Sequence, residues 1–276
     1  MGWLDLRRLK PAVPRAVPRV VSGQYTGNRM KDNFSTQASS YARFRPGYPA
    51  QLFDFLYDLC RDFNAAWDCA TGNGQIAGVL AERFETVEAT DISEKQVAQA
   101  VQKNNIRYSI EAAETPSFPD AHFDLVTVGQ SAHWFDFDRF YPQAIRVLKP
   151  GGILALVGYN LLQVDGPVDV LIKDLYSNTL GLYWDAERKH VDAAYASIPF
   201  PFSEIPLPEM QMEYEWTVEH LLGYLQTWSA LQHYIRKNGD SPLSPAFLVA
   251  LKTAWPETEV KTVKFPIFGR ITRKAL

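Results

Sequence analysis

A short glycine-bearing turn carries the clearest chemical pattern in this chain of 276 residues. Gly72-Asn73-Gly74 follows a predicted strand that ends at Trp67-Asp68, and a predicted helix begins directly after the turn. Asp91 lies 19 residues beyond Gly72, at the end of the next predicted strand. Glycines let the backbone approach a ligand closely, and an acid at this position pairs with ribose hydroxyls. The pattern therefore indicates a ligand that contains a nucleoside.

Asp68 helps to choose between the candidate ligands. It stands two residues before Ala70, close to the glycine turn. A pyrophosphate beside this carboxylate would meet like-charge repulsion, whereas an ammonium group would be attracted. S-adenosylmethionine carries an ammonium, a carboxylate, a ribose and an adenine, so it matches the acids better than a nicotinamide dinucleotide does. An NAD(P)-dependent oxidoreductase remains the alternative.

The elements that must position this turn alternate between strands and helices up to residue 160. Such alternation predicts right-handed crossovers and a mainly parallel sheet, covered by helices on both faces. Beyond residue 160, helices dominate and two late strands are expected to close the edge of the sheet. The predicted helices span 49–63, 75–84, 93–104, 138–148, 166–182, 185–196, 218–236 and 247–253, and the predicted strands end at 67–68 or span 86–91, 106–110, 123–128, 153–158, 211–216 and 259–272.

The first 31 residues differ in composition from the rest of the chain. They carry seven Lys and Arg residues against a single acid, Asp5, and three prolines that interrupt any helix. We expect a disordered extension here rather than a targeting peptide. Residues 32–276 are then one domain, with a cofactor-binding half and N-terminal lid at 32–160 and a cap with the closing strands at 161–276.

Composition excludes several classes of function. A formal net charge of −3 and a pI near 6.0 offer no broad attraction to nucleic acid or to an anionic membrane. Only Cys60 and Cys69 are present, which rules out a disulfide framework and favours a cytoplasmic setting. The five histidines show no metal-ligand spacing, so no metal is expected. The oligomeric state is not predicted.

Several segments together resemble the class I S-adenosylmethionine-dependent methyltransferases, and within them the small-molecule branch that includes trans-aconitate methyltransferases and related plant and fungal proteins. The resemblance covers about residues 33–276 and implies a Rossmann-like α/β sheet of seven strands, with an antiparallel C-terminal strand and a helical cap. The matching segments are Tyr41–Pro49, Trp67–Gln75, Ala89–Ser93, Phe123–Asp136, Val147–Gly152, Ile198–Phe202 and Thr227–Ala230.

The resemblance also implies a cofactor site. It places Ala112 where the family often has an aspartate that binds the adenine amino group, so that bond is absent, supplied by Glu114, or replaced by water. Ala70 replaces the first glycine of the turn, which requires a negative φ there. The implied cofactor residues are Asp68, Ala70, Gly72, Gly74 and Gln130 around the methionine portion, Asp91 on the ribose, Ile92, Ala113 and Glu114 near the adenine, and Tyr41 and Arg45 in a lid.

His133 and Trp134 are the candidate catalytic residues on the acceptor side, because they follow the fourth predicted strand at the edge where open α/β sheets bind ligands. A carboxylate acceptor needs no general base, whereas an alcohol or phenol would need one, and His133 is the candidate. His133 can equally be structural. In the cap, Arg236 can pair with an acidic substrate. We expect O-methylation of a small carboxylic acid; a cofactor-binding protein without transferase activity is the second alternative.

Overall fold

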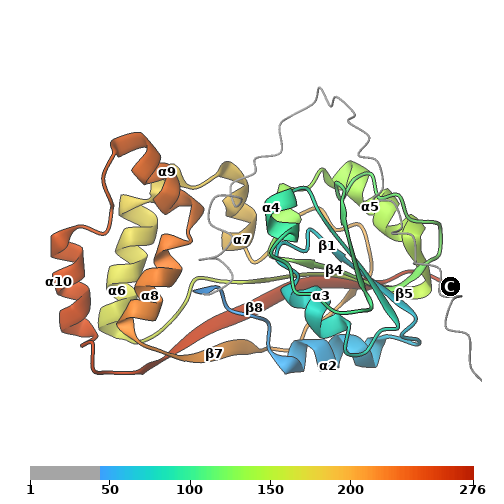
Figure 1. Ribbon diagram of the computed structural model, residues 1–276, viewed down its shortest axis with the longest axis horizontal. Coiled ribbons are helices and arrows are strands. Elements are labelled where there is room, and N and C mark those ends of the chain that lie inside the picture. The colour runs from blue at the N-terminus through green and yellow to red at the C-terminus, as the bar shows by residue number, and fades with distance from the viewer. Residues whose placement is uncertain (1–43) are drawn as a thin grey trace, which may run out of the picture. The chain divides into compact units, whose positions relative to one another are not determined.

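The structure is a computed structural model, and residues 44–276 of the chain are described from it (Figure 1). The predicted extension at 1–31 and the predicted lid residue Tyr41 lie outside these residues. The strand arrangement confirms the predicted fold, because β1 to β5 are parallel and the C-terminal β8 runs antiparallel to β5. The strands are β1 (Ala65–Cys69), β2 (Thr86–Asp91), β3 (Ile106–Ile110), β4 (Phe123–Gly129), β5 (Leu148–Tyr159), β6 (Glu204–Ile205), β7 (Gln211–Trp216) and β8 (Lys261–Arg273).

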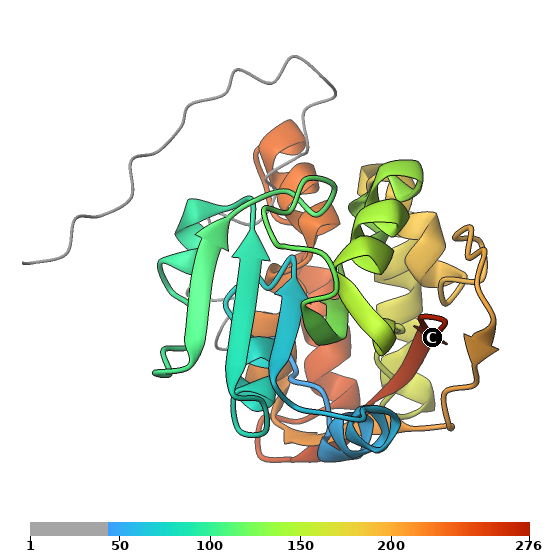
Figure 2. The ribbon, with the colours of Figure 1, turned by 90° about the vertical axis from the view of Figure 1, so that its right-hand side faces the viewer.

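The strand order places the first and fourth strands at the centre. The order is β3-β2-β1-β4-β5-β8-β6, and β7 pairs with β8 outside this path. Figure 2 shows β3, β2 and β1 side by side, with their arrowheads at one edge. The sheet has eight strands rather than the expected seven, because β8 is long enough to pair with β7 through its first half and with β5 and β6 through its second.

Alternate residues of the central strands face two separate hydrophobic layers. In β4, Leu125 faces the layer formed with α2 (Ala50–Leu59) and α3 (Gln75–Leu80). Its neighbour Val126 faces the opposite layer, formed with α5 (Phe137–Val147). Both side chains are fully buried. Burial on both faces explains why these strands read as nearly continuous apolar runs in the sequence.

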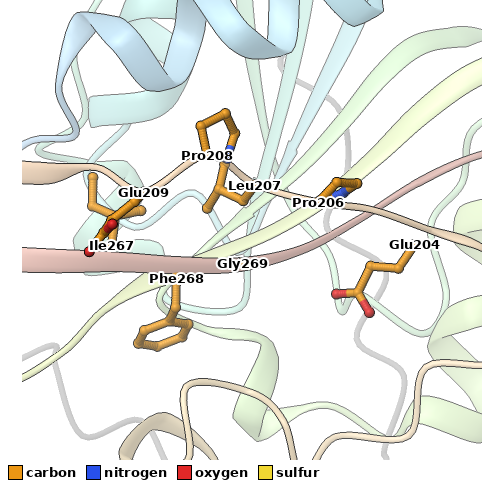
Figure 3. A pocket seen from close by; sticks show the side chains of 8 residues that line it. All are labelled: Glu204, Pro206, Leu207, Pro208, Glu209, Ile267, Phe268 and Gly269. Carbon is orange, nitrogen blue, oxygen red and sulfur yellow. The ribbon is translucent and has the colours of Figure 1, made fainter.

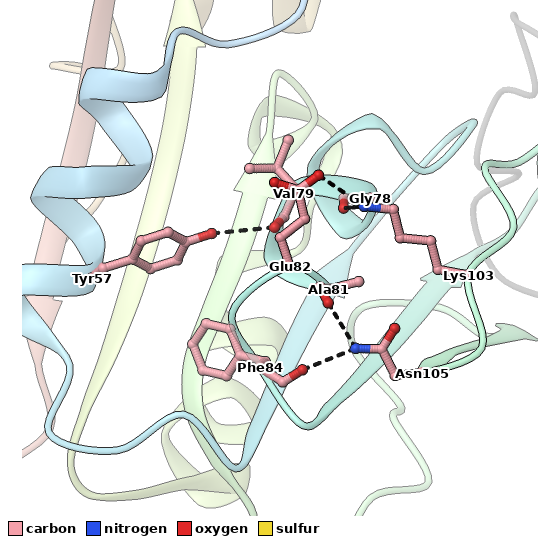
Figure 4. A network of polar contacts seen from close by, with 8 residues as sticks. All are labelled: Tyr57, Gly78, Val79, Ala81, Glu82, Phe84, Lys103 and Asn105. Carbon is pink, nitrogen blue, oxygen red and sulfur yellow. Dashed lines mark hydrogen bonds and ion pairs between the residues drawn. The ribbon is translucent and has the colours of Figure 1, made fainter.

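The end of the short helix α3 is held by side chains from other elements (Figure 4). Tyr57 of α2 donates a hydrogen bond to a carbonyl oxygen of α3, and Lys103 and Asn105 donate from the segment before β3. Since the last carbonyls of a helix have no partner within it, these bonds stabilise the helix that follows the glycine turn. The accepting oxygens belong to Gly78, Val79, Ala81 and Phe84.

The helix predicted at 93–104 is much shorter in the structure. Its N-cap is confirmed, because the Ser93 side chain accepts a hydrogen bond from the Gln96 backbone, but α4 spans only Glu94–Val97. The chain then turns back, and the Val101 amide donates to the Asn73 carbonyl at 3.0 Å. Tyr108 of β3 also donates to Val101, at 2.6 Å. The first bond ties the segment to the glycine turn and the second ties it to β3, so the chain leaves the helical path.

The cap is a group of helices that packs on β7 and on the first half of β8, at one end of the sheet (Figure 1). The single helix predicted at 218–236 is wrong, because the chain breaks at Thr227-Trp228. Trp228 is extended and packs against Tyr176, Trp184 and Tyr224, which a continuous helix would not allow. The cap contains α6 (Gly166–Asp174), a π turn (Leu175–Thr179), 3-10 turns (Gly181–Tyr183 and Ala186–Arg188), α7 (Lys189–Asp192), α8 (Val218–Gln226), α9 (Ser229–Asn238) and α10 (Pro245–Ala254).

Candidate functional site

The glycine turn and the end of β2 meet at the carboxyl edge of the sheet. The Gly72 amide donates a hydrogen bond to the Asp91 carboxylate at 2.8 Å, and the Thr71 amide donates to the Thr90 carbonyl at 2.9 Å. The second Asp91 oxygen accepts from the Ser93 amide at 2.8 Å. The parallel arrangement of β1 and β2 thus brings together the two ends of the sequence pattern.

Three residues of the turn adopt the left-handed backbone conformation. Their φ angles are +54° at Ala70, +56° at Gly72 and +77° at Gly74. The expectation of a negative φ at Ala70 is therefore wrong, and this residue carries strain that a glycine would not. A Cβ on Gly74 would lie 2.3 Å from the Tyr108 hydroxyl oxygen, so the position also needs glycine for space. A Cβ on Gly72 would meet nothing within 4 Å, which leaves the turn open on that side.

Asp68 lies beneath the turn, with only 1% of its surface exposed. One carboxylate oxygen accepts from the Thr71 hydroxyl at 2.5 Å and from the Ala77 amide at 3.0 Å, and the other accepts from the Thr127 hydroxyl at 3.0 Å. Burial raises the pKa of Asp68 to about 6, and these three hydrogen bonds oppose the rise. The carboxylate therefore organises the turn from below.

The residues expected near an adenine lie on the same edge but differ in exposure. Ile92, directly after Asp91, is 40% exposed, so its side chain is accessible to a flat apolar ligand. Ala113 and Glu114 are buried. A Glu114 carboxylate oxygen accepts from the Asp136 amide at 3.0 Å, so this side chain holds the connection between β4 and α5.

Gln130 follows β4 and joins it to the end of β5. It has a φ of +52°, and its side-chain amide makes two bonds to the backbone of one residue, Tyr159. Its oxygen accepts from the Tyr159 amide at 2.8 Å, and its nitrogen donates to the Tyr159 carbonyl at 3.2 Å. The side chain predicted to lie near the methionine portion thus clamps the two strand ends.

His133 and Trp134 form a 3-10 turn (Ala132–Trp134) after β4, with ring centroids 4.8 Å apart. His133 is 7% exposed, and its Nδ1 has no hydrogen-bond partner among residues 44–276. Burial lowers the pKa of His133 to about 3, and the nearby charge of Arg188 acts in the same direction, with a smaller effect from His190. The imidazole is therefore neutral at physiological pH.

Arg45 links the segment before α2 to the cap and to β5. Its Nε donates to the Thr227 hydroxyl at 2.9 Å, one Nη donates to the Tyr159 hydroxyl at 3.0 Å, and the other Nη donates to the Thr227 carbonyl at 3.2 Å. Its guanidinium also lies over the Tyr224 ring, 5.3 Å from the centroid. The predicted lid residue is therefore bound to the break between α8 and α9.

These elements enclose a small cavity of about 30 Å³, enough for little more than a water molecule. Four of the residues that line it, Arg45, Gln130, His133 and Trp134, were candidates from the sequence, whereas Asp185, Arg188 and Ser229 were not. Arg188 lies in a segment that reads as an ordinary amphipathic helix, so no local signal distinguishes it from a surface arginine. The lining residues are Arg45, Gln130, His133, Trp134, Trp184, Asp185, Arg188 and Ser229.

A larger cavity, of about 530 Å³, lies away from this edge between the segment 206–209 and β8 (Figure 3). Its carboxylates belong to Glu204 and Glu209, and Glu204 pairs with Arg270 at 2.6 Å. None of its lining residues comes from the turns after β1, β2 or β4. It therefore shares no group with the site at the carboxyl edge.

Residues 44–276 contain no group of three or more His, Cys, Asp or Glu side chains arranged to hold a metal ion. Within that range, no helix has the length and apolar character needed to cross a membrane.

Comparisons with known proteins agree on one family. A family model described as a methyltransferase domain matches residues 67–156. A putative methyltransferase of Dictyostelium discoideum is 30% identical over 257 residues, which cover 90% of this chain and 97% of that protein. An uncharacterized methyltransferase of Mycobacterium tuberculosis is 35% identical over 130 residues, covering 46% of this chain and 52% of that protein.

A solved structure extends the likeness to the three-dimensional fold. The putative type II methyltransferase from Anaeromyxobacter dehalogenans superimposes with a TM-score of 0.78 at 38% sequence identity, covering 84% of this chain and all of that one. Together with the Dictyostelium protein, it shows that the likeness includes the cap as well as the half that contains the glycine turn.

Proposed function

Because this chain belongs to the class I S-adenosylmethionine-dependent methyltransferases, we propose that it methylates an oxygen atom of a small carboxylic acid. Its cofactor is S-adenosylmethionine, which when bound supplies an electrophilic methyl group on a positively charged sulfur. The names of the three similar proteins described above do not specify an acceptor. The acceptor class, the cytoplasmic setting and the likeness to trans-aconitate methyltransferases therefore belong to the proposal.

The residues at the carboxyl edge fit this cofactor. Gly72 leaves open space beside the turn, and Asp91 is held against the turn by the Gly72 amide, where it can bind ribose hydroxyls. Ile92 offers an exposed apolar side chain to the adenine. Asp68 supports this surface from beneath through its bond to Thr71. We assign these residues to the cofactor site, with Gly74 keeping the turn close to β3.

The observation that carries the acceptor class is the chemistry of the small cavity. It is lined by two guanidinium groups, those of Arg45 and Arg188, and by a buried histidine that stays neutral. A group with a pKa near 3 is a weak base, so His133 cannot readily take a proton from an alcohol or a phenol at neutral pH. A carboxylic acid is already ionised at that pH and needs no base. The cavity therefore favours a carboxylate acceptor.

Shape and desolvation complete the proposed role of the cap. The aromatic rings of Trp134 and Trp184 line the cavity, and Arg45 holds the α8–α9 break over it. Since methyl transfer from a sulfonium depends mainly on positioning and on exclusion of water, a closed aromatic wall is what the reaction requires. The present volume is too small for an acceptor, so binding requires the cavity to widen.

The test is the chemical stability of the methylated product. The full chain is incubated with S-adenosylmethionine labelled in the methyl group and with a mixture of small acids, alcohols, phenols and amines. A methyl ester releases labelled methanol on mild alkaline hydrolysis, whereas methyl ethers and N-methyl groups are stable. We expect volatile label with the acids, and at least about a tenfold loss in Asp91→Ala through weaker cofactor binding. A base-stable product would contradict the acceptor class, and no product from any acceptor would favour a binding protein.

A further inference from the structure

The two arginines that line the cavity differ in the use of their hydrogen-bond donors. All three nitrogens of Arg45 donate to protein oxygens, those of Thr227 and Tyr159. Its guanidinium also lies over the Tyr224 ring. Arg45 therefore holds the segment before α2 against the cap, and few of its hydrogen-bond donors remain available for a substrate.

Arg188 is held in place, but its outer edge stays available. Its Nε donates to the Tyr176 hydroxyl at 2.9 Å, and its two Nη atoms have no hydrogen-bond partner within residues 44–276. The guanidinium carbon lies 4.8 Å from the Trp184 ring centroid and 5.6 Å from that of Tyr176. Because two neighbouring aromatic rings and one hydrogen bond hold the group, it loses little conformational freedom when it binds an anion.

The neighbours of Arg188 are themselves fixed. The Trp184 indole donates to the Tyr176 carbonyl at 3.0 Å, and the Tyr176 hydroxyl donates to Asp192 at 2.5 Å. Both rings also pack against Trp228, the residue at the helix break in the cap. The guanidinium is thus carried by a rigid aromatic group rather than by a flexible surface loop.

The charges around the cavity favour an anion. Arg45 and Arg188 contribute two positive charges to its lining, Asp185 contributes one negative charge, and His133 is neutral. Asp192 lies outside the lining, 3.6 Å from Nε of Arg188, with about half of its side chain exposed. An ammonium-bearing acceptor would be repelled by this net positive lining, whereas a carboxylate would be attracted.

From this arrangement we infer that Arg188 is the residue that recognises the acceptor. Its two Nη atoms would form a bidentate ion pair with a carboxylate of the substrate. The inference rests on the proposed function and deepens it, since it assigns the specificity of the same cavity to one side chain. Arginine forms such forked pairs with carboxylates at fixed geometry. Arg188 is a binding residue in this role, and a neutral or cationic analogue of the substrate would leave its donors unsatisfied.

The test measures binding of simple acids and their neutral amides to the full chain in the presence of S-adenosylhomocysteine. The probes are acetate, glutarate and benzoate, with acetamide, glutaramide and benzamide as their neutral counterparts. Quenching of tryptophan fluorescence reports binding, because Trp134 and Trp184 line the cavity. We expect at least one acid to bind more tightly than its amide, and Arg188→Gln to weaken that acid at least about tenfold without changing the amide.

Two further variants keep the result interpretable. Arg139→Gln removes an arginine that is exposed on α5 and does not line the cavity, so acid binding should stay unchanged. Arg188→Lys keeps the charge but loses the fork, so acid binding should fall by an intermediate factor, and it replaces the glutamine variant if that one unfolds. Equal acid affinity in Arg188→Gln and wild type, or no preference of wild type for any acid over its amide, would overturn the inference.

A methyl-transfer assay on the same acids separates this inference from the proposed function. If acid binding depends on Arg188 but no methyl ester forms, the proposed reaction fails and the assignment of Arg188 stands. If esters form with the same KM in Arg188→Gln and in wild type, the reaction stands and the assignment fails.

Discussion

The buried carboxylate of Asp68 makes the stability of this protein depend on pH in a direction opposite to that of most paired acids. We consider the substitution Asp68→Asn, which removes the charge and keeps the shape. The amide oxygen can accept from Thr71 and Ala77, as the carboxylate oxygen does now. The amide nitrogen can donate to Thr127, whose hydroxyl rotates to accept that bond. The variant therefore keeps a satisfied network beneath the turn.

The magnitude follows from the pKa of Asp68 in the two states. Burial raises it from 3.8 to about 6 in the folded protein, while the unfolded chain keeps an ordinary value. Because the folded-state pKa is the higher one, the contribution of this group to stability is fully present below pH 3.8 and is lost as the pH rises through about 6. At about 1.36 kcal/mol per pH unit between the two values, the loss is about 3 kcal/mol.

The assay is urea denaturation of wild type and Asp68→Asn, without cofactor, at pH values from 4 to 7. We expect the free energy of unfolding of the variant, relative to wild type, to rise by about 2.4 kcal/mol across this range, because part of the full change lies below pH 4. Asp62→Asn, a substitution of an exposed aspartate, controls for general effects of removing a negative charge. A difference that stays constant with pH, or a variant less stable than wild type at pH 7, would refute the reasoning.

Three other predictions test the turn, the histidine and the N-terminal segment. Ala70→Gly should raise the free energy of unfolding by about 0.5 kcal/mol, because relief of a positive φ outweighs the added entropy of the unfolded chain. The control Ala77→Gly, in α3, should lower the free energy of unfolding by about 1 kcal/mol. Equal losses of stability for the two variants in urea denaturation would contradict this prediction. Because the pKa of His133 is about 3, kcat for an acid should show no step near pH 6.5, and a step abolished by His133→Asn would make it a general base. Removal of residues 1–31 should leave turnover nearly intact. Removal of residues 1–48 also takes away Arg45 and should weaken S-adenosylhomocysteine binding, measured by calorimetry, at least about tenfold. Equal affinity of the two truncated proteins for S-adenosylhomocysteine would exclude a lid.

Local sequence was sufficient to predict the glycine turn and the acid beside it. The roles of Gly72 and Gly74 could be predicted from the sequence because only glycine adopts a left-handed backbone without strain. The place of Asp91 could be predicted because the end of one parallel strand lies beside the end of the next. The N-cap at Ser93 is equally local, since it depends on a residue three positions away. Ala70 shows the limit, because its left-handed φ breaks the usual preference of its residue type.

Long-range contacts decided where helices end. The helix after Ser93 stops early because Val101 bonds to Asn73, in the turn after a different strand. The helix in the cap breaks at Thr227, whose hydroxyl and carbonyl accept bonds from Arg45, 182 residues earlier in the chain. The helical pattern of the sequence continues beyond the observed ends of α4 and α8. No pattern within either segment indicates that Asn73 or Arg45 binds there.

The sequence by itself determined the class of the sheet, the position of the glycine turn and the acid that faces it, because all three depend on residue type and spacing along one stretch of chain. Only the tertiary structure decided what each polar group is free to do. It buried Asp68 beneath the turn, engaged every nitrogen of Arg45, and left the outer edge of Arg188 available within residues 44–276. Charge and hydrogen-bonding capacity depend on partners far away in the chain, so identical arginines acquire different roles only after folding.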